Sequence, residues 1–134
     1  MNAVMDAGAL LALLKHERGG AYVAELLERP GVTHYVHAAN ACEVYYDLFR
    51  QDGENGAEHG IDLLVATGIT FRDDMDPDFW RQAGIYKARF KRISLADCFG
   101  LALAARLGGE FVTTDHHEMD DIAQQGVCPI RFVR

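Results

Sequence analysis

The stretch that decides the fold is AVMDAGALLALL, residues 3–14. It begins with a short apolar run, continues through Asp6 and Gly8, and then repeats leucine at helical spacing. This pattern predicts a strand, a turn and a helix. Ligands of open parallel sheets bind beyond the carboxyl ends of the strands. An acid in this position therefore lies where such a sheet gathers its chemistry.

The rest of the chain repeats this alternation of strands and helices. Helices are predicted around 22–27, 37–50, 56–66, 77–90, 95–107 and 117–124, and further strands at 32–36, 69–71, 111–113 and 127–133. Pro129 interrupts the last strand, which places it at a sheet edge. The order predicts an α/β fold: one domain, 1–134, with a mostly parallel sheet of about five short strands and helices on both faces.

Composition excludes several classes of protein. A net charge of −7 argues against broad electrostatic adhesion to nucleic acid or anionic membrane. No apolar run approaches the ~18 residues of a membrane helix, and the N-terminus lacks a basic leader, so we expect a cytoplasmic protein without membrane contact. The three cysteines are expected to be small core residues in a reducing compartment, namely Cys42, Cys98 and Cys128.

Four acids occur just past an apolar run or inside a helical one, at the positions Asp6, Glu43, Asp97 and Asp115. The strand-to-helix junctions that carry them share one edge of a parallel sheet, so the acids are expected to converge. Glu43 lies well inside its helix, on a stripe with Asn40 and Asp47, where an unpaired carboxylate is costly.

Each of the other three acids has a purely structural alternative. Asp6 is also a suitable helix N-cap, and Asp97 is the third residue of a capping box begun by Ser94. Asp115 is a suitable cap with Glu118 as its box partner. Considered together, the acids favour a shared site for a hard cation, Mg²⁺ or Mn²⁺, of the kind used on phosphate esters.

Two other groups of residues are candidates for a role at this site. Asn40, one turn before Glu43, is either a partner that orients a ligand or water, or an amide on the helix surface. A basic cluster directly precedes Asp97 and is either solvated surface or a contact for the phosphates of a nucleic acid. It consists of Lys87, Arg89, Lys91 and Arg92.

With these residues aligned, the chain resembles the PIN-domain ribonucleases, and in size and layout the VapC-like toxins of type II toxin-antitoxin pairs. The resemblance covers nearly the whole chain. It is carried by VMDAGALLAL (4–13), NACEVY (40–45), SLADC (94–98) and VTTD (112–115). It implies a PIN-like three-layer fold and an Mg²⁺- or Mn²⁺-dependent endoribonuclease that cleaves RNA with an activated water. The implied metal-binding acids are Asp6, Glu43, Asp97 and Asp115.

The resemblance also implies partners and shows two departures. Homodimers are usual among such proteins, and so is a small antitoxin that blocks the site. Many relatives have serine, threonine or asparagine where this chain has Gly8, and an aromatic residue just after the fourth acid, where this chain has His116. Glu118 is either a fifth metal-binding acid or a helix cap, and His116 and His117 are either exposed loop residues or RNA contacts.

Two competing functions keep the same fold class. One is a PIN-like binding module with little or no nuclease activity, which acts through a protein or RNA partner; Gly8 and the negative charge favour it, and the four intact acids argue against it. The other is a phosphoacceptor receiver. Such a domain needs paired acids after the first strand and a late lysine, yet Asp6 stands alone and no lysine follows Lys91.

Overall fold

The computed structural model describes the backbone of all 134 residues and every side chain except those of His117 and Glu118. Along the chain the elements are β1 (Asn2–Met5), α1 (Ala7–Leu14), α2 (Gly20–Glu28), β2 (Thr33–His37), α3 (Ala38–Ala66), β3 (Thr70–Arg72), α4 (Pro77–Arg89), α5 (Leu95–Leu107), β4 (Glu110–Thr113), α6 (His116–Gln124) and β5 (Ile130–Phe132). The five strands pair in parallel, in the order β3-β2-β1-β4-β5. The predicted α/β fold is confirmed.

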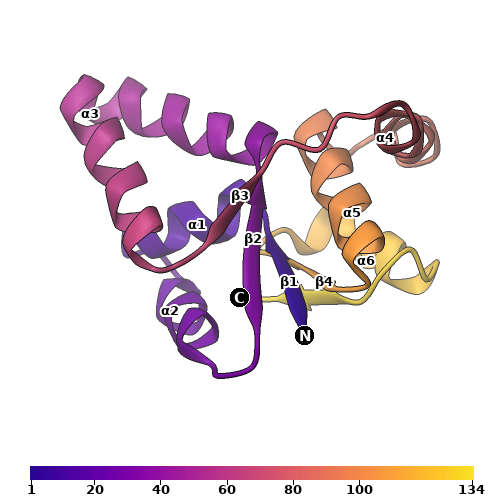
Figure 1. The fold of residues 1–134 in the computed structure, drawn as a ribbon, viewed down its shortest axis with the longest axis horizontal. Coiled ribbons are helices and arrows are strands. Elements are labelled where there is room, and N and C mark those ends of the chain that lie inside the picture. The colour runs from indigo at the N-terminus through magenta and orange to yellow at the C-terminus, as the bar shows by residue number, and fades with distance from the viewer.

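The sheet forms the middle of three layers (Figure 1). Successive residues of a strand point to opposite faces, and β1 illustrates the result. Ala3 and Met5 pack in a core with α1, α2 and α3, whereas Val4 packs in a second core with α4, α5 and α6. Both faces of the sheet are thus covered, and the strand ends are left to form a site.

Local signals account for most helix starts. The Asp76 carboxylate accepts a hydrogen bond from the Phe79 N–H at 3.4 Å, and Pro77 occupies the first turn of α4. Ser94 caps α5 in the same way. The two helices predicted on either side of Gly53 form one kinked element, α3, because Gly53 adopts φ 73° and ψ −170°.

One sequence expectation about packing is wrong. Cys98 and Cys128 are buried as predicted, but Cys42 is exposed on α3. Val44, Leu48 and Phe49 repeat on that helix at the spacing of an apolar stripe, but Phe49 keeps 48% of its surface exposed, while Val44 and Leu48 are buried. The helix therefore buries a narrower stripe than its sequence suggests. Within the described residues, no helix is both long and apolar enough to cross a membrane.

Candidate active site

Three of the four acids follow three adjacent strands at the centre of the sheet. Asp6 comes directly after β1, Glu43 lies in the second turn of the helix that follows β2, and Asp115 comes two residues after β4. Strand β1 pairs with β2 on one side and with β4 on the other. The order of strands thus brings acids that are more than a hundred residues apart in the sequence to one edge of the sheet.

The fourth acid, Asp97, is held by the start of α5. The Ser94 Oγ accepts a hydrogen bond from the Asp97 N–H at 3.1 Å, which is one half of the predicted capping box. Asp6 caps α1 with its own side chain, because its Oδ1 accepts from the Ala9 N–H at 2.7 Å. Both structural alternatives considered from the sequence are therefore real, and both hold an acid in place at a helix start.

Asn40 links these two helix starts. Its side chain is completely buried, so the surface alternative is wrong. The Oδ1 accepts from the N–H of Ala7 at 3.2 Å, and the Nδ2 donates to the carbonyl of Ala96 at 3.1 Å. Ala7 follows Asp6 and Ala96 precedes Asp97, so one amide fixes the distance between the backbones that carry two of the acids.

The acids perturb one another's protonation. Burial, opposed by hydrogen bonds from Thr113 and Ala9 and reinforced by Glu43 and Asp115, raises the pKa of Asp6 to about 6. Burial and the charges of Asp6, Glu43 and Asp115 raise the pKa of Asp97 to about 7. Burial, followed by the nearby Asp47, also raises the pKa of Glu43. The charges of neighbouring acids thus add to the effect of burial at Asp6 and Asp97.

Half-buried acids elsewhere in the molecule have cationic partners. Asp47, on the same helix as Glu43, pairs with Lys15, and Glu110 pairs with Arg131 at 2.7 Å. In contrast, none of the described side chains forms an ion pair with Asp6, Glu43 or Asp97. On the polar stripe predicted for α3, Asp47 is therefore neutralised by a lysine, whereas Glu43 has no cationic partner among the described side chains.

The donor set has the chemistry of a site for a hard cation, because carboxylate oxygens are the ligands that Mg²⁺ and Mn²⁺ prefer. The spacing between the carboxylates, however, is wider than a bound ion would require. Leaving aside His117 and Glu118, no three histidine, cysteine, aspartate or glutamate side chains lie close enough to hold one ion as they are placed. A shared ion therefore requires the carboxylates to turn toward one another.

A hydroxyl that the sequence interpretation missed supports two of the acids. The Oγ1 of Thr113, the last residue of β4, accepts from the Asp115 N–H at 3.0 Å and also lowers the pKa of Asp6 by a hydrogen bond. The signal was present in the sequence, since Thr113 is a polar residue at the end of an apolar strand.

The predicted basic cluster divides into two parts. The Lys87 ammonium donates to the carbonyls of Lys91 and Ile93, at 3.0 and 2.6 Å, and so holds the turn between α4 and α5. The other three basic side chains are exposed and line a cavity of about 390 Å³. They are Arg89, Lys91 and Arg92.

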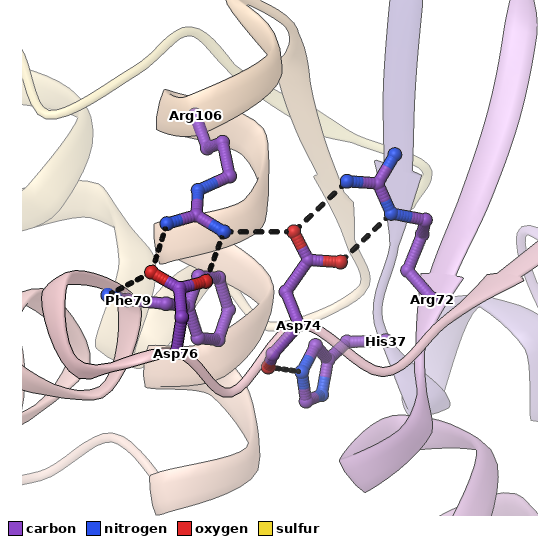
Figure 2. A network of polar contacts seen from close by, with 6 residues as sticks. All are labelled: His37, Arg72, Asp74, Asp76, Phe79 and Arg106. Carbon is purple, nitrogen blue, oxygen red and sulfur yellow. Dashed lines mark hydrogen bonds and ion pairs between the residues drawn. The ribbon is translucent and has the colours of Figure 1, made fainter.

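A charged network that the sequence did not predict anchors the helix that carries Asp97 (Figure 2). Arg106, in the last turn of α5, donates to Asp74 at 3.0 Å and to Asp76 at 2.6 and 2.8 Å. Arg72 holds the other side of Asp74 with two hydrogen bonds, at 2.7 and 2.9 Å. The network ties the connection between β3 and α4 to α5. Asp74 and Asp76 therefore have a structural role.

The residues after Asp115 are described in part. His116 stacks on Phe132 with ring centroids 4.0 Å apart, and its Nε2 forms a hydrogen bond with the carbonyl of Arg134 at 2.5 Å. His116 thus packs on β5 and the C-terminus. The proposed roles of His117 and Glu118 fall on side chains outside the described residues.

Solved structures share this fold. VapC20 of Mycobacterium tuberculosis, described as a toxin that cleaves the sarcin-ricin loop, has a TM-score of 0.73 at 16% identity, over 89% of this chain and 94% of that one. VapBC2 of Rickettsia felis, solved with a promoter DNA fragment, has a TM-score of 0.74 at 13% identity, over 98% of both chains. DNA-bound VapBC of Salmonella typhimurium has a TM-score of 0.74 at 13% identity, over 100% and 99%.

Sequence comparisons are consistent with the fold. A search of curated proteins gives no match. The family model of the PIN domain, however, matches residues 3–125, a range that runs from β1 through β4 and includes all four acids. The chain therefore belongs to the PIN-domain family.

Proposed function

We propose that this chain is a divalent-metal-dependent endoribonuclease, with Asp6, Glu43, Asp97 and Asp115 as the acids that hold the metal. One observation carries the proposal. Burial raises the pKa of Asp6, Asp97 and Glu43, and the charge of Glu43 adds to the rise at Asp6 and Asp97, yet no described side chain forms an ion pair with any of the three. A divalent cation supplies that missing charge, which is worth most where water is excluded.

The reaction assigned to the site is hydrolysis of an RNA phosphodiester. When bound, a divalent cation supplies a water of lowered pKa and stabilises negative charge on the phosphate oxygens. The protein's part is positional: Asn40 fixes the spacing of Asp6 and Asp97, and Thr113 holds Asp6 and Asp115. Arg89, Lys91 and Arg92, at the end of α4 and in the turn that follows, guide the RNA backbone.

The test is cleavage of structured RNA with Mg²⁺ or Mn²⁺ by the wild type, Asp6→Asn and Asp97→Asn. Loss of a metal-holding carboxylate is expected to cost more than the roughly 10–100-fold that removal of an outer partner costs. Asp62→Asn, which removes an exposed acid of α3, is the matched control and keeps full activity. Equal cleavage by all four proteins would refute the mechanism.

The alternative, a binding module without nuclease activity, gives a different result in calorimetry. The nuclease binds Mn²⁺ at millimolar concentration or below, whereas the module does not. The module is further distinguished by RNA binding that Asp6→Asn leaves unchanged.

We further propose that the chain is the toxin of a toxin-antitoxin pair that acts in the cytoplasm, as a homodimer inhibited by a cognate antitoxin. Its likeness in fold to VapC and VapBC structures supports this role. Exposed apolar residues on α4, Trp80 and Ile85, each 45% exposed, offer a surface for association. Expression is expected to arrest growth, and Asp6→Asn is expected to abolish the arrest.

A further inference from the structure

At the start of α1, the absence of a side chain on Gly8 lets the Thr114 hydroxyl approach the helix beside Asp6. A Cβ placed on Gly8 would lie 2.6 Å from the Oγ1 of Thr114 and 3.5 Å from the Oδ1 of Asp6. The Thr114 hydroxyl thus stands next to the position where a side chain at residue 8 would begin. Any larger residue at position 8 would force this hydroxyl to move.

The Thr114 hydroxyl forms no hydrogen bond with the described residues and can therefore bind a water. Thr114 is half-buried between β4 and Asp115, and within the described part of the chain its side chain forms no hydrogen bond. The preceding threonine is different, since the Thr113 hydroxyl is engaged by the Asp115 N–H. The Thr114 hydroxyl and the Asp6 carboxylate both lie near the Cβ position of residue 8 and form no direct hydrogen bond with each other. Two polar groups in such an arrangement are commonly bridged by a water.

We propose that Thr114 is a positioning residue of the acid site: its hydroxyl and the Asp6 carboxylate together hold one water between them. The water orients the Asp6 oxygens for the metal, and the hydroxyl thereby contributes to metal affinity. This inference rests on the proposed function. It also gives Gly8 a role, because the glycine admits the Thr114 hydroxyl to the site.

The test compares Thr114→Val, which removes the hydroxyl but keeps the shape, with Thr114→Ser, which keeps the hydroxyl. Calorimetry with Mn²⁺ is expected to show about tenfold weaker binding by the valine variant, the effect of losing a partner that orients a ligand. The serine variant is expected to bind like the wild type. Melting temperatures in EDTA are expected to agree, since no protein hydrogen bond is lost. Thr70→Val, at an exposed threonine of β3, is the control.

Gly8→Ala provides an independent arm. Its methyl group displaces the Thr114 hydroxyl, so it is expected to weaken Mn²⁺ binding by the same factor as Thr114→Val. The double variant is expected to be no weaker than either single variant, because both changes remove one interaction. Multiplied losses in the double variant would overturn the assigned coupling.

The remaining outcomes separate the two proposals. Equal Mn²⁺ affinity of wild type and Thr114→Val would overturn the role of Thr114 and leave the nuclease proposal intact. A wild type that binds no Mn²⁺ would overturn both.

Discussion

Replacing Asn40 by leucine tests how the acid site is assembled. Leucine keeps the approximate volume but removes the acceptor for the Ala7 N–H and the donor to the Ala96 carbonyl. Each lost hydrogen bond costs about 0.5–1.5 kcal/mol, and each polar group left buried without a partner costs about 1–3 kcal/mol. Since these costs overlap, the free energy of unfolding is expected to fall by about 2–4 kcal/mol.

For a domain of 134 residues this loss corresponds to a fall in Tm of about 6–15 °C. The assay is thermal unfolding in EDTA at pH 7, so that no metal contributes. Asn55→Leu, at an exposed asparagine of the same helix, is the control and is expected to stay within about 0.5 kcal/mol of the wild type. If Asn40→Leu melts as Asn55→Leu does, the bridging role is refuted.

Three further changes give expected outcomes. Asp97→Asn is expected to raise Tm in EDTA at pH 8, because the pKa of the Asp97 carboxyl is about 7 in the folded protein against an ordinary value of 3.8, so that its ionised form destabilises the fold. The gain in Tm is expected to shrink toward pH 5 and to reverse when Mn²⁺ is added. Thermal unfolding at each pH measures both effects. Asp74→Asn is expected to cost about 2 kcal/mol in urea unfolding at pH 7. Hydrogen bonds from its arginine partners lower the Asp74 pKa to about 2, so the loss should vanish as the pH falls through 4 toward 2. Gly100→Ala is expected to cost about 1–3 kcal/mol, because its Cβ would lie 2.4 Å from the Phe111 ring; an unchanged urea midpoint would contradict this packing.

The fold could be predicted from the sequence because its signals are local. The Asp76-Pro77 pair begins a helix, Ser94 caps another, and the short apolar runs before Asp6 and Asp115 are strands. The convergence of the acids follows from the same signals, since alternating strands and helices imply a parallel sheet whose carboxyl ends share one edge.

Contacts between distant segments could not be predicted in this way. Arg106 meets Asp74 and Asp76, about thirty residues earlier in the chain, and nothing in either segment indicates the other. Asn40 was ambiguous for a related reason. Helical spacing places it on a polar stripe, but only the packing of α3 against α5 shows that the stripe is buried there.

The distribution of cations over the molecule connects stability to function. Outside the acid site, arginines and a lysine pair with half-buried acids such as Asp47 and Asp74, and Arg106 pairs with both Asp74 and the exposed Asp76. At the site the supporting groups that the structure describes are neutral: the Asn40 amide and the hydroxyls of Ser94 and Thr113. Neutral support fixes the acids in place without cancelling their charge. Under the proposed function, the acids therefore retain the negative charge that attracts a divalent cation, and a bound cation would relieve their repulsion.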